Sequence, residues 1–318
     1  MFFVLCLISF VLPSLAFNFT AWDNLLLQNG TITRGTIDGI QLNVVDYSKI
    51  VGSSELKETL TMLSQKHAVK NFTHDEFLTF YINAYNVLAV DTIVRHQCEA
   101  DVFGDCRPLP GIRSASSLLS GTIWNKPAGT LNGKEVSLQE VEDTLRDPKK
   151  AGFKFEEDSR IHSAIVCASV SCPDLRRGAY LVDQVQQQLN ESFTDFMKNQ
   201  GKGFKLTKSD NVIEMSAIFS FFPADFGNDP LKFVLPYLSV ADRTYIVDQQ
   251  KSGKKFDITY FSYNWNLNGM NLTCAHDRPC FTSLDLLITC GVLFCCFPLM
   301  CGLALWWRRR RRSRYRAV

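Results

Sequence analysis

The sequence predicts an α+β fold dominated by helices, with a small sheet, in one domain that precedes a transmembrane helix. Apolar residues recur at helical spacing in several segments, whereas only short segments alternate in the manner of strands. No shift in composition divides the chain before residue 284, so we interpret that part as a single domain.

The helices and strands follow from this periodicity and from capping and turn signals. Helices are predicted at residues 19–28, 55–67, 74–96, 137–146, 180–199, 216–226 and 231–238. Strands are predicted at residues 160–166 and 256–263, and in hairpins over 130–136 and 204–214, the first of which turns at Asn132-Gly133.

The helix after residue 73 is expected to lie at the centre of the core. Thr73 and Glu76 form a capping box, and the helix that they open is apolar on nearly every face. Thr79, Asn83 and Asn86 form one polar stripe along it. A buried amide without a hydrogen bond costs about 1–3 kcal/mol, so we expect the asparagines to clamp a backbone segment or to face a polar pocket.

Composition excludes other classes of protein and shows an uneven charge. The chain of 318 residues is 46 % hydrophobic and 12 % aromatic, which excludes an intrinsically disordered protein. Its net charge is +2, yet residues 1–307 carry 27 basic and 32 acidic side chains, a net charge of −5, and seven arginines lie in the last eleven positions. A basic tail on an acidic body is typical of contact with a membrane or with nucleic acid.

The segment before the arginines favours the membrane. Leu286 to Trp307 contains no charged side chain in 22 residues, enough for a helix to cross a hydrocarbon core of about 30 Å. Trp306 and Trp307 then lie at the interface, and the arginines follow on the cytoplasmic side. We therefore expect a helix spanning the lipid bilayer over 284–307 and a basic cytoplasmic tail over 308–318 near anionic lipid, and no nucleic-acid binding. A buried core helix would rarely be followed by five arginines.

The N-terminus predicts a secretory signal peptide over residues 1–16. The stretch is apolar and ends in Ser14-Leu15-Ala16, although no Lys or Arg precedes it, and an uncleaved signal anchor is the alternative. The expected topology is single-pass type I, at the plasma membrane or an endomembrane, with residues 17–283 extracellular or luminal. Five N-x-S/T sequons in that region predict N-glycosylation, at Asn18, Asn29, Asn71, Asn190 and Asn271.

Six cysteines lie in the expected luminal region. An even number in an oxidising compartment favours disulfides, and six cysteines allow 15 connectivities. Short loops make Cys98–Cys106 and Cys274–Cys280 candidate local pairs. Cys167 and Cys172 remain, and they either pair with each other or carry chemistry.

The segment from Arg160 to Pro173 concentrates the reactive side chains. A thiol hydrolase or acyl transferase needs a cysteine nucleophile, a histidine base and a polar group that orients the imidazole, roles that Cys167 or Cys172, His162, and Asn83 or Asn86 could fill. On one continuous strand His162 and Cys167 would face opposite sides, so their contact requires the strand to end before Cys167. The alternatives are a Cys167–Cys172 disulfide beside a hydrogen-bonded histidine, and a His/Cys/Cys metal site without a recognisable fourth ligand. No cofactor motif is present in the sequence.

Several dispersed motifs resemble one family. FYINAYNVLAV at 80–90, LNGKEVSLQEVE at 131–142, RIHSAIVCASVSCPDL at 160–175 and ITYFSYNWNLN at 258–268 resemble the family of the domain of unknown function 547. The resemblance covers about residues 50–268, in order. It implies that His162, Cys167, Cys172, Asn83 and Asn86 occupy motif positions of the family, and it implies no activity.

Two functional hypotheses follow. The first is a membrane glycoprotein whose luminal domain is a thiol-dependent hydrolase or acyl transferase, with Cys167 as the preferred nucleophile because small residues follow it. The second is a non-catalytic domain that binds a ligand or a protein partner, with Cys167 and Cys172 in a structural disulfide.

Overall fold

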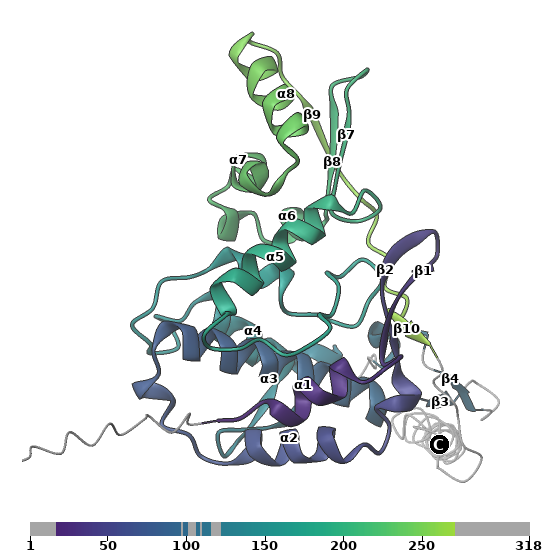
Figure 1. Cartoon of the computed structure of the whole chain (residues 1–318), viewed down its shortest axis with the longest axis vertical. Coiled ribbons are helices and arrows are strands. Elements are labelled where there is room, and N and C mark those ends of the chain that lie inside the picture. Colours follow the sequence, from purple (N-terminus) through teal and green to yellow (C-terminus); the bar gives the residue numbers. More distant parts are fainter. Residues whose placement is uncertain (1–16, 97, 101–105, 109, 116–121, 271–318) are drawn as a thin grey trace, which may run out of the picture.

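The computed structural model describes residues 17–96, 98–100, 106–108, 110–115 and 122–270 (Figure 1). The α-helices are α1 (Thr20–Leu27), α2 (Ser54–Ser64), α3 (His74–Arg95), α4 (Leu138–Arg146), α5 (Val185–Lys198), α6 (Ile218–Phe221), α7 (Pro230–Val234) and α8 (Val240–Lys251). The strands are β1 (Ile32–Ile37), β2 (Ile40–Asp46), β3 (Cys98–Ala100), β4 (Cys106–Pro108), β5 (Pro127–Leu131), β6 (Lys134–Ser137), β7 (Phe204–Thr207), β8 (Val212–Met215), β9 (Asp257–Tyr260) and β10 (Gly269–Met270). The predicted α+β class is confirmed, with several small sheets in place of one.

Helix α3 is the buried helix around which the lower half of the molecule is built. Every residue from Phe77 to Val90 is buried, and both hydrogen bonds of the predicted capping box at Thr73 are present. Among the described residues it is the one helix apolar and long enough to cross a membrane, but 89 % of that apolar window is buried inside the protein. This helix is therefore the core helix that its sequence predicts.

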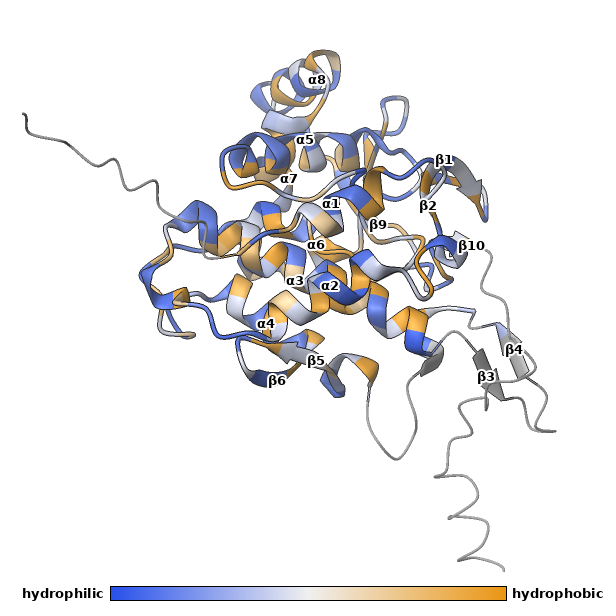
Figure 2. Cartoon of the chain, turned by 60° about the horizontal axis from the view of Figure 1, so that its bottom comes forward, coloured by the Kyte–Doolittle hydropathy of each residue, from blue (hydrophilic) through white to orange (hydrophobic). Residues whose placement is uncertain are grey.

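Shorter elements cover α3 on its sides. Helices α2 and α4 and the hairpin β5–β6 contact it directly, and α1 packs on α2 (Figure 1). The covering helices are amphipathic: in Figure 2 they alternate between orange apolar and blue polar stretches. The hairpin turns at Asn132-Gly133, both with positive φ, as its sequence predicts.

The upper half is a second layer with its own apolar cluster. Strands β7, β8 and β9 form a sheet in that order, flanked by the short helices α6 and α7 and by α8 (Figure 1). Helix α5 joins the two clusters, because Val185 and Leu189 pack in the lower one and Phe193 and Phe196 in the upper one.

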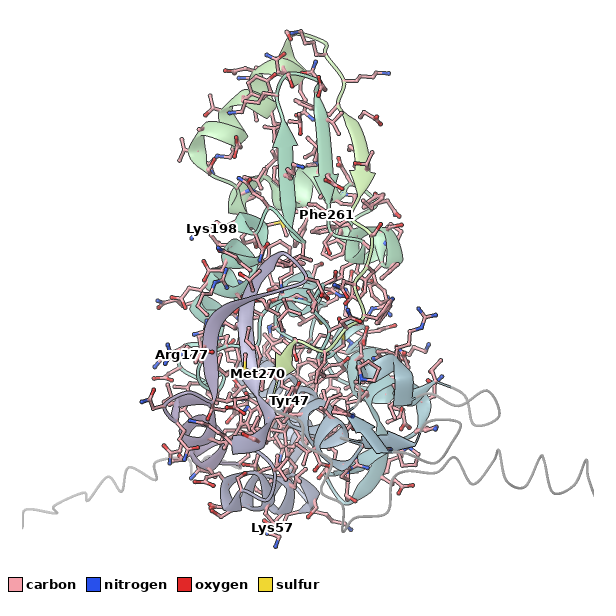
Figure 3. All side chains as sticks on the ribbon, turned by 90° about the vertical axis from the view of Figure 1, so that its right-hand side faces the viewer. Tyr47, Lys57, Arg177, Lys198, Phe261 and Met270 are labelled. Atoms are coloured by element: carbon pink, nitrogen blue, oxygen red, sulfur yellow. The ribbon has the colours of Figure 1, made fainter. Side chains whose placement is uncertain are left out.

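The chain then returns downward and passes the lower core again. Figure 3 shows this path from Phe261, below the upper sheet, to Met270 beside Tyr47. At its end β10 pairs in parallel with β2, which pairs in turn with β1. The β1–β2 hairpin turns at Asp38-Gly39, both with positive φ. Neither this hairpin nor α8 was predicted.

Two predicted elements are wrong in detail. Residues 160–166 are not a strand: Ser159–Ser163 form a 3-10 helix, which begins where the Asp158 carboxylate accepts a hydrogen bond from the backbone N–H of Arg160. Helix α5 begins at Val185 and not at Tyr180, because the backbone N–H and C=O of Tyr180 are both bonded to the side chain of Asn83.

The predicted signal peptide (1–16), the predicted transmembrane helix (284–307) and the basic tail (308–318) lie outside the described residues.

Candidate active site

Cys167 and Cys172 lie on a tight turn that follows the 3-10 helix. Ala168 adopts a left-handed conformation with φ 61°, and the backbone N–H of Cys172 donates to the carbonyl of Ser169 at 3.1 Å. The left-handed conformation costs a non-glycine residue of the order of 1 kcal/mol or more in free energy, so the surrounding contacts must hold the turn. The two cysteines are not joined in a disulfide, and their sulfur atoms are 3.0 Å apart.

The returning C-terminal segment holds the turn from outside. The backbone N–H groups of Val170 and Ser171 donate to the carbonyls of Asn266 and Asn264, and the N–H of Asn268 donates to the carbonyl of Ala168. The motifs over 160–175 and 258–268, nearly one hundred residues apart in the sequence, therefore form one structural unit.

The sulfur of Cys167 is surrounded by hydrogen-bonding groups. Cys172 lies at 3.0 Å, the Ser169 hydroxyl at 3.2 Å and the Tyr263 hydroxyl at 3.4 Å. The hydrogen bond from Cys172, with those from Ser169 and Tyr263, outweighs burial and lowers the pKa of the Cys167 thiol to about 6. Burial raises the pKa of Cys172, followed by its hydrogen bond with Cys167. Cys167 is therefore a thiolate at neutral pH and Cys172 a thiol.

An aromatic cavity of about 200 Å³ opens onto these thiols. Its walls also contain the one predicted histidine and a carboxyl group; the lining residues are Tyr85, Trp124, Gln139, Glu142, His162, Ile165, Cys167, Cys172, Ile218, Phe221, Phe222, Tyr263 and Trp265. Concave, mostly apolar cavities with a few reactive polar groups are the usual form of small-molecule sites.

His162 is held by a carboxylate from the upper half of the molecule. Its Nε2 lies 2.8 Å from Oδ2 of Asp225, and the ring stacks on Phe222. Burial lowers the pKa of His162, although Asp225 opposes this shift, so the ring is neutral at pH 7. A neutral ring that donates from Nε2 to Asp225 carries its lone pair on Nδ1, as a general base requires.

Asp225 also binds Arg146. The guanidinium donates from Nε at 2.5 Å and from Nη2 at 3.0 Å. Burial alone would raise the pKa of Asp225, but the hydrogen bonds from His162 and Arg146 outweigh it and hold that pKa well below its usual range. The carboxylate is therefore ionised at any pH at which the protein would be assayed.

Glu142 is a second ionisable group on the cavity wall. Burial raises the pKa of its carboxyl to about 7, and the hydroxyl of Tyr85 donates to it at 3.4 Å. This raised pKa keeps Glu142 partly protonated at neutral pH, which makes it a candidate proton donor.

The two asparagines of the predicted polar stripe on α3 clamp backbone, the first of the two outcomes expected for them, whereas the hydroxyl of Thr79 has no hydrogen-bond partner among the described residues. Asn86 donates from Nδ2 to the carbonyl of Ala164 at 2.9 Å and accepts from the N–H of Val166 at 2.8 Å, and Asn83 binds Tyr180 in the same way. Neither amide contacts His162, so the expectation that one of them orients the imidazole is wrong; their hydrogen-bonding groups are already used by the backbone, and Asp225 takes that role.

His162 and Cys167 line the same cavity, but no hydrogen bond of the described residues joins them. The structure therefore brings together three predicted side chains, His162, Cys167 and Cys172, and it places Asn83 and Asn86 behind them as supports.

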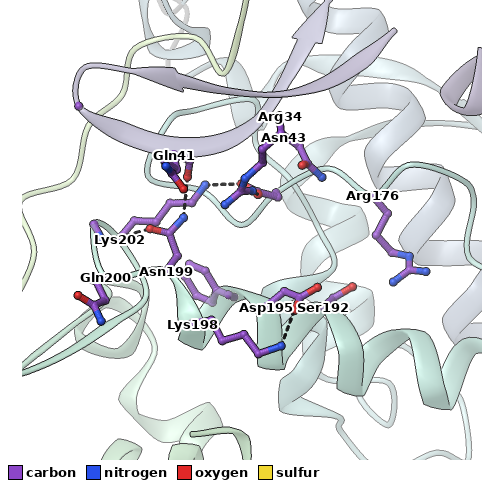
Figure 4. Close-up of a pocket in the computed structure, with 14 residues that line it drawn as sticks. Arg34, Gln41, Asn43, Arg176, Ser192, Asp195, Lys198, Asn199, Gln200 and Lys202 are labelled. Atoms are coloured by element: carbon purple, nitrogen blue, oxygen red, sulfur yellow. Dashed lines mark hydrogen bonds and ion pairs between the residues drawn. The ribbon is translucent and has the colours of Figure 1, made fainter. Parts of the chain in front are cut away.

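A second, polar cavity of about 620 Å³ lies on the other side of the turn (Figure 4). Lys202, 2 % exposed, donates there to the carbonyls of Val170 and Cys172 and to the carboxylate of Asp174. Its ammonium group therefore fixes the turn through two of the turn's own backbone carbonyls. Figure 4 shows Asn199 bonded to Gln41 beside Lys202, with Lys198 and Asp195 below.

Other predicted sites are only partly within the described residues. Cys98 and Cys106 lie in β3 and β4, which pair with each other in an antiparallel ladder. Cys274, Cys280 and Asn271 lie outside the described residues, whereas the four remaining sequon asparagines, Asn18, Asn29, Asn71 and Asn190, are all exposed. Among the described residues, no group of three or more His, Cys, Asp or Glu side chains could hold a metal ion.

Four side chains around the site are not predicted by the sequence. Asp225, Glu142 and Lys202 lie far along the chain from the cysteines, and their spacing gives no signal. Tyr263 lies within the motif ITYFSYNWNLN, so that motif could have indicated it.

The fold and the site together define an α+β domain with a buried cysteine pair on an aromatic cavity. Residues 69–197 match the family model described as "Protein of unknown function, DUF547", so the chain contains a DUF547 domain, as its motifs predict. The match is shorter than the expected 50–268: it includes His162 and both cysteines but ends before Asp225 and Tyr263. No curated protein and no solved structure matches the chain.

Proposed function

We propose that this domain is a thiol-dependent acyl-transfer enzyme, a hydrolase or an acyl transferase, with Cys167 as its nucleophile. The observation that carries the proposal is the Cys167 sulfur, which lies on an aromatic cavity and whose hydrogen-bond partners lower its pKa to about 6. A thiolate is the nucleophilic form of cysteine, and this one exists at neutral pH without a histidine that removes its proton.

The other groups on the cavity have roles in the remaining steps. The thiolate attacks the carbonyl carbon of the substrate, a carbon–sulfur bond forms, and the leaving group departs with a proton from Glu142. His162, through Nδ1, then removes a proton from water, which breaks the thioester and releases the acid. An alcohol or amine in place of water gives the transferase reaction.

The cavity walls indicate the class of acyl group. Aromatic rings from Trp124, Phe221, Phe222 and Trp265 surround a volume of about 200 Å³, which suits a small apolar acyl chain or ring and excludes a folded peptide segment.

The test is to trap the acyl-enzyme. The purified full-length chain is incubated, in its reduced state, with activated esters and thioesters of short acyl groups, quenched in acid and analysed by peptide mass spectrometry. We expect acylation of Cys167, at a rate that rises with pH through about 6 as the thiolate forms and falls above about 7 as Glu142 loses the proton that the leaving group needs.

Matched variants locate the reaction. Cys167→Ser is expected to abolish acylation, whereas Cys172→Ser is expected to retain it. Acylation that persists in Cys167→Ser, or no acylation of Cys167 in the wild-type chain at any pH from 5 to 9, would refute the proposal and favour the non-catalytic, ligand-binding alternative.

We also propose that the domain is displayed outside the cytosol by a type I anchor over residues 284–307. In support, Phe17, the first residue after the predicted cleavage site, is buried against Phe72 and Phe80, and the four described sequon asparagines are exposed. Digestion of the chain expressed in animal cells with peptide N-glycosidase is expected to increase its gel mobility. No shift would contradict this topology.

A further inference from the structure

The distance between the two thiols points to a second reaction of the same site. The sulfur atoms of Cys167 and Cys172 are 3.0 Å apart, and a disulfide bond is about 2.05 Å long, so an approach of about 1 Å would join them. The backbone N–H of Cys167 already donates to the sulfur of Cys172 at 3.0 Å. The turn that brings them together is held by the carbonyls of Asn264 and Asn266, which accept from its N–H groups, and by Lys202, which donates to its carbonyls.

The two cysteines differ in the way that an attacking and a resolving thiol must differ. Both cysteines line the cavity, but Cys167 is 9 % exposed and ionised at neutral pH, whereas Cys172 is 4 % exposed and protonated. After burial and the hydrogen bond with Cys167, the negative charge on Cys167 also raises the pKa of Cys172. Once the sulfur of Cys167 is in a covalent bond that charge is gone, and Cys172 loses its proton more easily.

We propose that Cys167 and Cys172 are a redox-active dithiol that reduces a low-molecular-weight disulfide entering the aromatic cavity. The Cys167 thiolate attacks one sulfur of the substrate, a mixed disulfide forms, and the other half leaves as a thiolate. The Cys172 thiol then loses its proton and attacks the sulfur of Cys167, which breaks the mixed disulfide, releases the second thiolate and forms the Cys167–Cys172 disulfide. Two electrons pass from the dithiol to the substrate, and a small external thiol reduces the protein again.

This activity goes beyond acyl transfer and shares with it the nucleophile and the aromatic cavity. It also gives the site a regulator, because a Cys167–Cys172 disulfide removes the thiolate on which the proposed acyl transfer depends. The other polar neighbours of the Cys167 sulfur are the hydroxyls of Ser169 and Tyr263. They stabilise the thiolate but cannot form a disulfide with it, so Cys172 is the group that resolves the mixed disulfide.

The test uses the full-length chain equilibrated with mixtures of reduced and oxidised glutathione, quenched in acid, alkylated and analysed by peptide mass spectrometry over residues 160–176. We expect the wild-type chain to form the Cys167–Cys172 disulfide reversibly. Cys172→Ser should instead accumulate a glutathione adduct on Cys167, and Cys167→Ser should leave Cys172 unmodified. Circular dichroism of both variants serves as the control that each is folded.

Three outcomes would overturn the proposal: no disulfide at any glutathione ratio, a disulfide that no thiol can reduce in the folded protein, or independent glutathionylation of both cysteines. The acyl-enzyme assay separates the two proposals. Disulfide exchange without acylation of the reduced chain refutes acyl transfer alone, and acylation without disulfide formation refutes only the dithiol.

Discussion

Replacing Asn86 by leucine is expected to lower the free energy of unfolding by about 2–6 kcal/mol. The side chain is 2 % exposed and makes two hydrogen bonds with the backbone, to the carbonyl of Ala164 and from the N–H of Val166. Leucine has nearly the same size but leaves both backbone groups buried and unpaired, at about 1–3 kcal/mol each. Urea unfolding followed by circular dichroism measures the change.

Two further variants test whether the loss of stability comes from the unpaired backbone groups. Asn83→Leu should cost a similar amount, because Asn83 binds the backbone of Tyr180 with the same two hydrogen bonds. Asn24→Leu, on the exposed face of α1, changes the same residue type without a buried partner and should cost less than about 0.5 kcal/mol. If Asn86→Leu were as stable as Asn24→Leu, the amides would not clamp the backbone as described.

The sequence predicts the parts of the fold that local signals define. Capping boxes at Thr73 and Ser137 are both formed, and Asn132-Gly133 forms a hairpin turn. The apolar run of α3 correctly predicts a core helix, and its two asparagines clamp backbone as expected from the cost of an unpaired buried amide.

The errors arise where a tertiary contact overrides the local pattern. Residues 160–166 are apolar enough for a buried strand, yet Asp158 begins a 3-10 helix there and Asn86 takes the backbone groups that a neighbouring strand would need. Tyr180 is similarly kept out of α5 by Asn83. Neither effect can be read from spacing, because the partners are 78 to 97 residues apart.

The candidate site was predicted by residue type and not by geometry. Cys167, Cys172 and His162 do line one cavity, but the group that orients the histidine is Asp225, 63 residues away on the short helical turn after α6. The thiolate likewise depends on Tyr263, 96 residues away. Long-range pairs of this kind are fixed only when the upper half folds onto α5, so the sequence alone identifies the reactive atoms but not their partners.

The second large effect is expected at Asp225. Asp225→Asn should reduce the rate of deacylation of Cys167 by about 10²–10⁴-fold, the usual contribution of general acid–base catalysis, and should leave the rate of acylation little changed, because His162 acts only on the attacking water. The Asn amide can donate to Nε2 of His162, which would move the ring proton to Nδ1 and remove the base from the cavity. Alkylation of Cys167 by iodoacetamide should change little, because the thiolate is stabilised by Cys172, Ser169 and Tyr263.

The stability of Asp225→Asn should depend on pH differently from that of the wild-type chain. The pKa of Asp225 is lower in the folded chain than in the unfolded chain, so its stabilising contribution is fully present above about pH 4 and is lost as the pH falls through the folded-state pKa. Wild-type stability should therefore decline below pH 4 more steeply than that of Asp225→Asn, which should be the less stable protein at pH 7.

Asp195→Asn is the matched control, since that carboxylate is 75 % exposed and pairs only with Lys198 among the described residues. A deacylation rate in Asp225→Asn within twofold of that of Asp195→Asn would show that His162 is not the base, and unchanged acid stability would show that Asp225 is not the charge that holds the two halves of the site together.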